Sequence, residues 1–404
     1  MKLHRNLCDA VVDALRVIFN EGRYADKVIE HTLKEDKRRG ARDRAFIAEH
    51  VYEAVRWRRL LAHGAGVGEE PPFQYGDLWA MLGVLLILRQ VELPAWEEWQ
   101  ALDPVEVVRR RTAAEKIRPL RESVPDWLDA VGVRELGTAW DAELAALNKP
   151  AALVIRVNTL KARVPEVVAR LLELGVETRG DARFPEALIL SKRISLFSTD
   201  LFREGWIEVQ DAASQAVAHF AQVEPGHRVV DSCAGAGGKS LHLAALMGGR
   251  GRIISLDVEE WKLEELRRRA RRAGASNIEA RLIEGAKSIK KLEASADRLL
   301  LDVPCSGLGV LRRNPDAKWK LDPAFLEKVR NVQREILQGH CRMVRPHGLI
   351  IYATCSLLPS EGEEQVRGFL AKNTACTLVE ERRLTVAGDG FDGFYMAKIR
   401  RGSL

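Results

Sequence analysis

The sequence predicts an α/β fold in which a Rossmann-like, doubly wound sheet follows a small α+β module and an all-helical N-terminal domain. Strand and helix patterns alternate from residue 225 onward, and this order is typical of parallel sheets. Apolar residues recur at helical spacing through the first 145 residues. Between these parts the chain follows a β-α-β-β order, which predicts a small sheet covered by one helix. We therefore expect three domains, 1–145, 150–208 and 209–404.

Composition narrows the class of protein. The chain has 404 residues, 46% of them hydrophobic and 30% charged, as in a globular protein with an ample core. Its six cysteines form no CxxC pair, so we expect free thiols, no metal site and a cytoplasmic location. The longest apolar run, Leu78 to Leu88, is too short to span a bilayer. The formal charge of +6 mildly favours a nucleic-acid partner, and we expect a monomer.

The N-terminal third carries the pattern of a helical core. Helices are predicted over Leu7–Ile18, Phe46–Val55 and Leu78–Val91. Six of the nine tryptophans lie in this third, and such large side chains usually fill a core. The charge run from Lys34 to Arg44 fits a solvated loop and helix start, with RNA contact as the alternative.

The remaining elements follow from shorter patterns. The small module should contain a helix over Pro165–Leu174 and short strands within 153–160, 176–178, 188–190 and 206–210. The large sheet should contain the strands Arg228–Asp231, Arg252–Asp257, Ile278–Ile283, Arg298–Val303, Gly348–Ala353, Thr377–Val379 and Tyr395–Ile399.

Two of these strands run into loops that carry thiols. Residues 300–309 read as a buried strand that ends at Asp302, followed by a loop with Cys305. Residues 348–356 repeat the arrangement and end at Cys355. Open α/β sheets bind ligands outside the carboxyl ends of their strands. If the two strands are neighbours, both thiols face one cleft.

A loop of small residues follows the first strand of the large sheet. Such residues let the backbone approach a ligand closely, and the N-terminus of a helix comes next. The next strand ends at Asp257, where an acid commonly accepts ribose hydroxyls. This pattern alone leaves NAD, FAD and S-adenosylmethionine open. The loop consists of Cys233, Ala234, Gly235, Ala236, Gly237, Gly238 and Lys239.

Together these segments resemble the RNA (cytosine-5)-methyltransferases of the Sun/Nop/RsmB type. The resemblance covers roughly residues 150–400 and rests on DSCAGAGGKS at 231–240, LDVPCSGLG at 301–309, YATCS at 352–356 and DGFYMAKIR at 392–400. The N-terminal third looks like the NusB-type domain of the bacterial ribosomal-RNA branch. The resemblance implies a methyltransferase domain, S-adenosylmethionine as cofactor and RNA as partner, with ribosomal RNA favoured over transfer RNA.

The resemblance also implies roles for individual residues. Cytosine C5 becomes nucleophilic once a thiolate adds at C6, and the family assigns this addition to the position of Cys355 and product release to that of Cys305. The spacing of the motifs leaves the two roles interchangeable. Asp302 would hold the cytosine amino group or the amino-acid part of the cofactor. Further contacts to S-adenosylmethionine would come from residues 233–239 and Asp257.

This chain departs from the family pattern at two places. Ala236 stands where the family usually has proline, which predicts a less rigid cofactor loop. The family tends to carry an aspartate after the third strand, where this chain reads Glu284-Gly285-Ala286-Lys287, and the acid contact there stays open.

RNA contacts are expected from basic residues near the thiols. Candidates are Arg312, Arg313, Lys318 and Lys320, with Trp319 available for stacking on a base. The arginine-rich helix segment 267–272 fits a solvated face and an RNA contact equally well. By resemblance, the 150–208 module is a further RNA-binding surface.

Two other classes of function fit part of the pattern. A catalytically silent RNA-binding ribosome-assembly factor could keep this fold, although the presence of Cys305, Cys355, Asp302 and Lys239 argues against it. A dinucleotide-dependent oxidoreductase would need neither thiol, and it would bind NADH in preference to S-adenosylmethionine.

Overall fold

The computed structural model describes residues 3–403, and the chain divides into two compact units. The first comprises the chain up to Lys149 together with Leu311–Pro323. The second comprises Pro150–Val310 and Ala324–Leu404. The limits of the three expected domains stay predictions.

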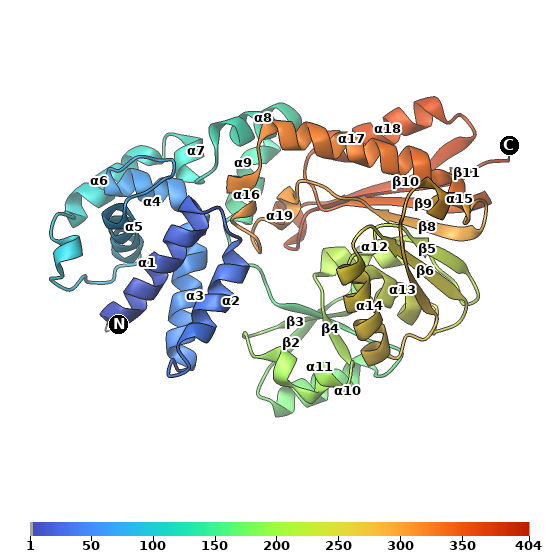
Figure 1. Cartoon of the computed structure of the whole chain (residues 1–404), viewed down its shortest axis with the longest axis horizontal. Helices are drawn as coiled ribbons and strands as arrows, with labels where there is room; N and C mark the ends of the chain where they lie inside the picture. Colours follow the sequence, from blue (N-terminus) through green and yellow to red (C-terminus); the bar gives the residue numbers. More distant parts are fainter. Residues whose placement is uncertain (1–2, 404) are drawn as a thin grey trace. The chain divides into compact units, whose positions relative to one another are not determined.

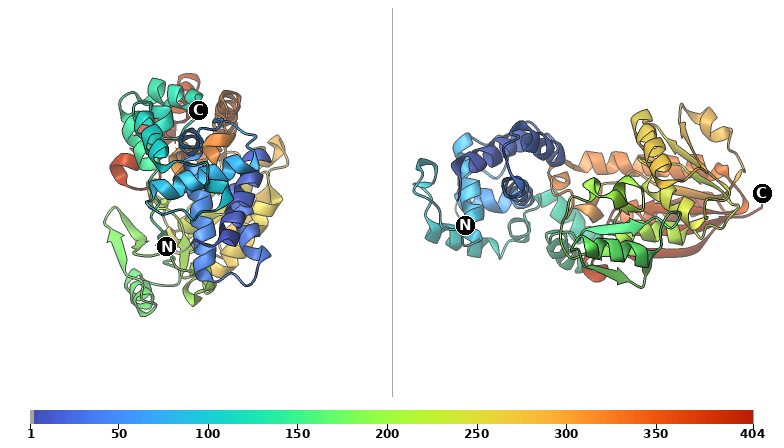
Figure 2. Two further views of the ribbon diagram at one scale, coloured as in Figure 1. Left: turned by 90° about the vertical axis from the view of Figure 1, so that its left-hand side faces the viewer. Right: turned by 90° about the horizontal axis from the view of Figure 1, so that it is seen from below.

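The first unit is built from helices, and its described residues contain no strand. Its part up to Lys149 is drawn blue to blue-green in Figures 1 and 2, and the inserted α16 is drawn orange. Helices were predicted around α1, α3 and α5, and each is confirmed. The helices are α1 (Arg5–Asn20), α2 (Ala25–Glu35), α3 (Ala41–Arg56), α4 (Arg58–Ala65), α5 (Tyr75–Leu88), α6 (Pro104–Ala114), α7 (Arg118–Arg121), α8 (Asp126–Leu136), α9 (Ala139–Leu147) and the inserted α16 (Ala317–Lys320).

Tryptophans fill the core of this unit, as their clustering predicted. Trp79, Trp99 and Trp140 are each at most 4% exposed. Trp99 packs edge-on against Trp79 at 5.3 Å, and its indole N–H donates to the carbonyl of Trp79 at 2.8 Å. The indole N–H of Trp140 donates to Asp129 at 2.9 Å. The buried N–H groups of Trp99 and Trp140 therefore each have an acceptor, which burial of a tryptophan requires.

The segment that carries α16 corrects the expected RNA contacts. The indole N–H of Trp319 donates to the carbonyl of Val55 at 2.7 Å, and the guanidinium of Arg58 lies 4.0 Å from its ring centre. Lys318 is 3% exposed, and burial holds its pKa well below the ordinary value. Lys320 pairs with Asp316 at 2.9 Å. These side chains pack among the N-terminal helices, so the prediction that Trp319 is free to stack on a base was wrong.

The second unit begins with a four-stranded antiparallel sheet of order β2-β3-β1-β4. The predicted β-α-β-β order is confirmed by β1 (Val154–Val157), α10 (Val164–Glu173), β2 (Thr178–Asp181) and β3 (Phe184–Leu190), followed by α11 (Asp200–Arg203) and β4 (Ile207–Val209). β1 ends earlier than the pattern predicted because Asn158 turns the chain. Its side-chain oxygen accepts the N–H of Leu160, and its NH₂ donates to the carbonyls of Gly205 and Ala273.

The large sheet has the order β10-β11-β9-β8-β5-β6-β7. Its strands are β5 (Arg228–Asp231), β6 (Arg252–Asp257), β7 (Ile278–Leu282), β8 (Ala296–Asp302), β9 (Val344–Thr354), β10 (Cys376–Leu384) and β11 (Phe394–Arg401). The five strands from β9 to β7 are parallel, as predicted. β11 runs antiparallel between β9 and β10, which departs from the expected parallel sheet. The connection from β10 to β11 holds only α19 (Val386–Asp389), too short for a crossover that would make the two strands parallel.

Helices cover both faces of this sheet, so the predicted doubly wound arrangement is confirmed (Figure 1). One face of the sheet is covered by α12 (Ala212–Phe220), α13 (Gly238–Leu246) and α14 (Glu260–Ala273). These helices share a core with strand residues such as Leu300 and Ile351. The other face is covered by α15 (Ala286–Lys290), α17 (Pro323–His340) and α18 (Glu363–Lys372). These helices share a second core with strand residues such as Leu299 and Ile350. The alternation of adjacent residues between two cores is the period of a strand buried on both faces.

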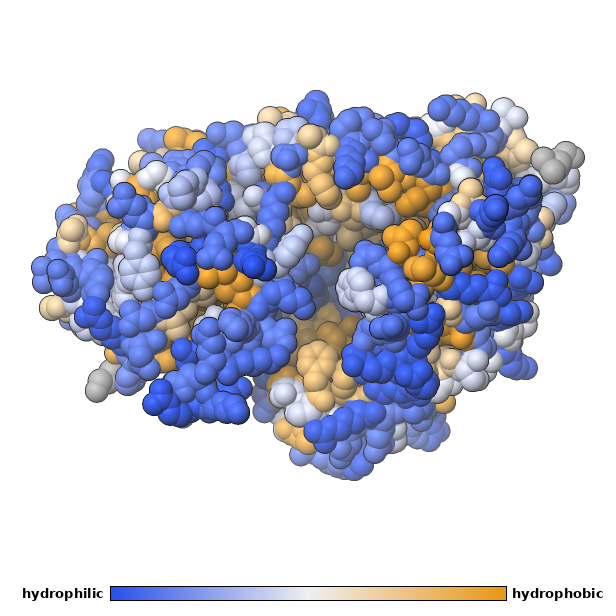
Figure 3. Space-filling model, in the orientation of Figure 1, coloured by the Kyte–Doolittle hydropathy of each residue, from blue (hydrophilic) through white to orange (hydrophobic). Residues whose placement is uncertain are grey.

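The hydrophilic character of the surface (Figure 3) agrees with the content of 30% charged residues. Hydrophilic side chains cover most of the face drawn in Figure 3. Among the described residues, no helix combines the length and apolar character that a membrane crossing requires.

Candidate active site

Two thiols meet at the carboxyl end of the large sheet. β8 and β9 are parallel neighbours, with Asp302 opposite Ala353, so the expectation that the two strands are adjacent is confirmed. The sulfur of Cys305 lies 3.2 Å from the sulfur of Cys355. Both side chains are half-buried. Because adjacent parallel strands deliver their following loops to one edge, residues 50 positions apart share one site.

The two thiol loops are docked on each other through their backbones. The N–H of Gly309 donates to the carbonyl of Cys355 at 2.8 Å. The carbonyl of Gly309 accepts the N–H of Gly393 at 2.9 Å. A Cβ at position 309 would lie 2.1 Å from the carbonyl oxygen of Gly393 and 2.7 Å from that of Cys355. Only glycine fits this crossing, because both obstacles are backbone atoms.

Gly309→Ala is expected to lower the free energy of unfolding by about 1–3 kcal/mol, since the backbone must shift to make room for the methyl group. Methyl transfer should fall further than stability does, because the shift displaces Cys355. Urea unfolding and a methylation assay measure the two effects. Gly368→Ala is the control, since a Cβ there meets nothing within 4 Å. Unchanged stability and activity in Gly309→Ala would contradict the docking.

The thiol pair keeps Cys355 protonated in the free protein. The hydrogen bond with Cys305, followed by burial, raises the pKa of the Cys355 thiol well above its ordinary value. Lys239 acts in the opposite direction. The thiolate, which is the reactive form, is therefore scarce at neutral pH until the surroundings of Cys355 change.

Alkylation of Cys355 by iodoacetamide should keep rising with pH where an ordinary thiol, with a pKa of about 8.5, has levelled off. A raised pKa means that the thiolate accumulates only at higher pH. Cys305→Ala removes the largest cause of the shift, so the profile of Cys355 should move to lower pH. Peptide mass spectrometry of protein labelled between pH 7 and 10 measures both profiles. A wild-type profile that levels off where an ordinary thiol does, or at lower pH, would contradict the expected shift.

A lysine–aspartate pair lies beside the thiols. Nζ of Lys239 lies 2.5 Å from a carboxylate oxygen of Asp302 and 5.1 Å from the ring centre of Phe394. Burial works against the charge on Lys239, but Asp302 outweighs it, and the pKa of Lys239 is raised. Lys239 therefore carries its positive charge at neutral pH, within electrostatic reach of Cys355.

The loop between β5 and α13 has room for a ligand. A Cβ at Gly235 would meet nothing within 4 Å, so this side of the loop faces open space. At Gly237 a Cβ would lie 2.6 Å from the side chain of Leu266, so glycine is required there for packing on α14. Asp257 accepts the N–H of Gly235 at 2.8 Å and that of Glu259 at 3.0 Å. The arrangement fits a nucleoside-bearing cofactor, because the carboxylate at the end of β6 is held against the loop.

Ala236 does not leave the loop unsupported. Its carbonyl accepts a hydrogen bond from Arg269 at 2.8 Å. Arg269 is itself paired with the buried Glu208 at 3.0 Å. This contact ties the loop to α14, and the lower rigidity expected from the absence of a proline stays a prediction.

Comparisons with known proteins agree with this site. Residues 218–400 match a family model described as 16S rRNA methyltransferase RsmB/F, and residues 124–196 match the RsmF/B-like, ferredoxin-like domain. A probable ribosomal RNA small subunit methyltransferase B from Synechocystis is 33% identical over 390 residues, covering 88% of this chain and 87% of that protein. The chain belongs to the RsmB/F methyltransferase family.

Solved structures support the same fold. The crystal structure of PH0851 covers 99% of this chain and all of its own, with a TM-score of 0.84 at 24% identity. A methyltransferase homolog protein from Pyrococcus horikoshii covers 70% of this chain and 97% of its own, with a TM-score of 0.63 at 27% identity. The family model and the Synechocystis relative confirm the resemblance to the RsmB/F family that the sequence indicated.

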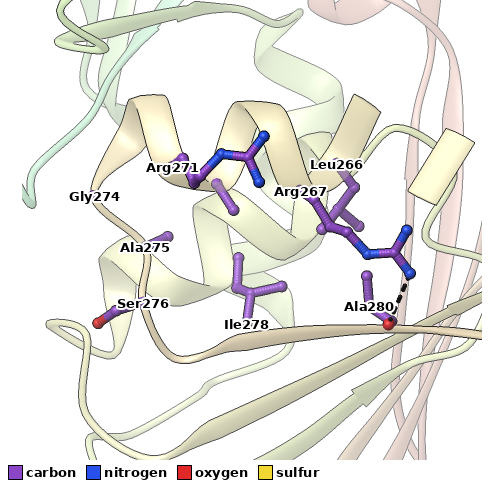
Figure 4. A pocket seen from close by; sticks show the side chains of 9 residues that line it. Leu266, Arg267, Arg271, Gly274, Ala275, Ser276, Ile278 and Ala280 are labelled. Atoms are coloured by element: carbon purple, nitrogen blue, oxygen red, sulfur yellow. Dashed lines mark hydrogen bonds between the residues drawn. The ribbon is translucent and has the colours of Figure 1, made fainter. Parts of the chain in front are cut away.

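The arginine-rich helix α14 of this RsmB/F family member is largely engaged in internal contacts. Arg269 and Arg272 both pair with Glu208. Arg267 pairs with Glu260 at 2.6 Å and donates to the carbonyl of Ala280 at 3.3 Å, the dashed line in Figure 4. A groove of about 410 Å³ lies between the end of α14 and β7, with Arg271 on its rim. Arg267, Arg269 and Arg272 thus have partners within the protein, and whether the segment 267–272 is a solvated face or an RNA contact stays a prediction.

Glu284, the candidate for the missing acid after β7, is exposed. Its backbone N–H donates to the hydroxyl of Ser288 at 3.2 Å, and this bond fixes the start of α15. A role for Glu284 in cofactor contact stays a prediction.

A histidine cluster braces the two sheets of the second unit. A ring nitrogen of His219 on α12 lies 2.7 Å from a carboxylate oxygen of Glu186 on β3. His242 on α13 is fully buried, and Nε2 of its ring lies 3.8 Å from the same oxygen. Burial, reinforced by the charge of Arg156, lowers the pKa of His242 to about 3. Although these groups could approach a metal ion, the positive Arg156 and the closed contact with His219 disfavour a cation there.

Four polar residues around the thiols were not anticipated from the sequence. Glu361 is fully buried between the loops and accepts hydrogen bonds from Ser306, Ser356 and Gln333. A signal was present in the sequence, because each thiol is followed directly by a serine.

Proposed function

We propose that this protein transfers a methyl group from S-adenosylmethionine to C5 of a cytosine in small-subunit ribosomal RNA, through a covalent bond between Cys355 and C6. The observation that carries the proposal is the pair of thiols 3.2 Å apart, at the ends of adjacent parallel strands and beside Lys239 and Asp302. Methylation of an exocyclic nitrogen or a ribose oxygen would require no thiol. Two thiols match a reaction that forms a bond to C6 and later breaks it.

Residues 233–239 and Asp257 would hold the cofactor. The open side of Gly235 admits it to the backbone, and Asp257 still offers lone pairs to ribose hydroxyls. When bound, S-adenosylmethionine supplies an electrophilic methyl group on a positively charged sulfur. The remaining steps belong to side chains of the chain itself.

Cys355 is the nucleophile. Its thiolate adds to C6 of the cytosine, and the electron pair displaced from the C5–C6 bond makes C5 able to attack a methyl group. Lys239 favours the thiolate, since it lowers the pKa of Cys355 against the other influences. The base must leave its stack to reach sulfur at the end of β9.

Cys305 completes the cycle. After methylation C5 carries both the new methyl group and its original proton. Removal of that proton by Cys305 restores the C5–C6 double bond as the bond from C6 to Cys355 breaks. The short distance between the sulfurs supports this division of roles, because both thiols must act on one ring. Asp302, held by Lys239, is positioned to accept a hydrogen bond from the cytosine amino group.

The relatives support ribosomal RNA as the substrate class, because the Synechocystis protein is named as a probable ribosomal RNA small subunit methyltransferase B. Transfer RNA remains the alternative substrate for the same chemistry. A catalytically silent assembly factor would bind RNA and leave the methyl group of the cofactor in place.

The test is incorporation of labelled methyl from S-adenosylmethionine into separate samples of small-subunit ribosomal RNA and transfer RNA, followed by nucleoside analysis. We expect 5-methylcytidine in the ribosomal sample. Label found only in transfer RNA would change the substrate. Label in another nucleoside would overturn the chemistry, and RNA binding without any label would favour the assembly factor.

A further inference from the structure

Glu361 forms a buried polar clamp between the two thiol loops. It ends the short 3₁₀ helix η5 (Pro359–Glu361) and is 0% exposed. One carboxylate oxygen accepts the hydroxyls of Ser306 at 2.5 Å and Ser356 at 2.6 Å. The other accepts the N–H of Ser306 at 2.8 Å and the side-chain NH₂ of Gln333 at 3.0 Å.

Every hydrogen-bonding position of the Glu361 carboxylate is occupied. A carboxylate has about four lone-pair positions, and four donors occupy them here. Because each hydroxyl proton goes to Glu361, the hydroxyl oxygens are free to accept. Ser356 accepts the N–H of Leu358 at 3.1 Å, and Ser306 accepts that of Leu308 at 3.4 Å. Each bond fixes the backbone just after a thiol.

The clamp holds residues that are adjacent to both cysteines in the chain. Ser306 directly follows Cys305, and Ser356 directly follows Cys355. Gln333 on α17 also donates to the carbonyl of Pro304 at 2.9 Å, so the chain is held on both sides of Cys305. Glu361 hydrogen-bonds to the residue that follows each cysteine, and it acts on the two sulfurs through these neighbours.

We propose that Glu361 is a positioning residue that sets the separation and orientation of the sulfurs of Cys305 and Cys355. The inference rests on the proposed function, in which one thiol bonds to C6 and the other completes release. Both must reach the same ring, and a displacement of about 1 Å in such a site costs on the order of 100-fold in rate.

Glu361→Gln tests the clamp with little change in size. The amide replaces one acceptor oxygen with an NH₂ donor, which then faces donors. Glu364→Gln is the matched control, because it makes the same change three residues away at an exposed position. Should Glu361→Gln fail to fold, Ser356→Ala removes a single donor and serves in its place.

The first readout is oxidative coupling of the thiols by diamide, which needs neither RNA nor cofactor. Two thiols lose two protons and two electrons to form the Cys305–Cys355 disulfide, and the N=N bond of diamide is reduced to a hydrazine. Peptide mapping follows the disulfide. We expect Glu361→Gln to couple about tenfold more slowly than wild type, since the sulfurs spend less time in contact, and Glu364→Gln to match wild type.

The second readout separates binding from turnover. Glu361→Gln should lower kcat by about 10–100-fold while the Kd for S-adenosylmethionine stays within about twofold, because the cofactor loop lies on other strands. Wild-type coupling together with wild-type kcat would overturn the inference, in Glu361→Gln or in its Ser356→Ala substitute. If wild type makes no 5-methylcytidine, the proposed function fails, and the coupling rate alone then judges the clamp.

Discussion

Cys355→Ala is expected to lower methyl transfer by about 10³-fold or more, because removal of a covalent nucleophile leaves only binding and orientation. C5 of an unactivated cytosine attacks a methyl group poorly, and the neighbouring thiol of Cys305 is assigned to product release rather than to the addition at C6. Binding of S-adenosylmethionine should be retained, since the loop 233–239 follows a different strand. Nucleoside analysis after a single turnover, together with calorimetry, measures the two effects.

The control for this variant is Cys341→Ala. Cys341 is also a free, half-buried thiol, but it lies in the 3₁₀ helix η4 (Cys341–Met343) just before β9 rather than after the strand. It should leave the rate of methyl transfer close to that of wild type. A Cys355→Ala protein that still methylates at a tenth of the wild-type rate would show that another group is the nucleophile.

Cys305→Ala is expected to stop the cycle at a different point. Addition of Cys355 to C6 and methylation should still occur, but the C5 proton would have no nearby base. The covalent complex should therefore accumulate, and multiple turnover should fall by about 10³-fold. A denaturing gel run after incubation with RNA and S-adenosylmethionine separates the complex from free protein.

The double variant Cys305→Ala/Cys355→Ala checks that assignment. It should form no complex, because the attacking thiol is absent. If Cys355→Ala alone accumulates a complex and Cys305→Ala does not, the two roles are exchanged. The motif spacing in the sequence permits either order, so this outcome would keep the chemistry and reverse the residues.

The features that the sequence predicted well are local. The strand before Cys305 and the strand before Cys355 could be recognised because an apolar run ends directly in a polar loop. The cofactor loop could be recognised because its small residues and Asp257 lie within 25 residues of one another. In each case the signal and the structure it predicts occupy the same short segment.

The features that it missed depend on residues far apart in the chain. Trp319 looked available to RNA, but its acceptor is the carbonyl of Val55, 264 residues away. Arg269 and Arg272 looked like a basic face, but Glu208 on β4 pairs with both. β11 lies antiparallel between β9 and β10 because the connection from β10 is short. The periodicity of a strand does not encode its direction in the sheet.

The active site likewise contains residues that a short motif predicts and a geometry that depends on distant parts of the chain. Cys305 and Cys355 could each be selected from a motif, but their separation of 3.2 Å depends on strand order. Glu361 belongs to no recognisable acid motif. Its role emerges only where the serines after both thiols converge on one carboxylate.

The most direct test of the account is to identify the residue that bonds to RNA. Cys305→Ala protein is incubated with S-adenosylmethionine and small-subunit ribosomal RNA, denatured and digested with protease and nuclease. Mass spectrometry then locates the modified peptide. The account predicts a methylated cytidine nucleotide attached to the peptide that contains Cys355. Attachment to any other residue, or 5-methylcytidine formed by wild type with no covalent complex from any thiol variant, would contradict it.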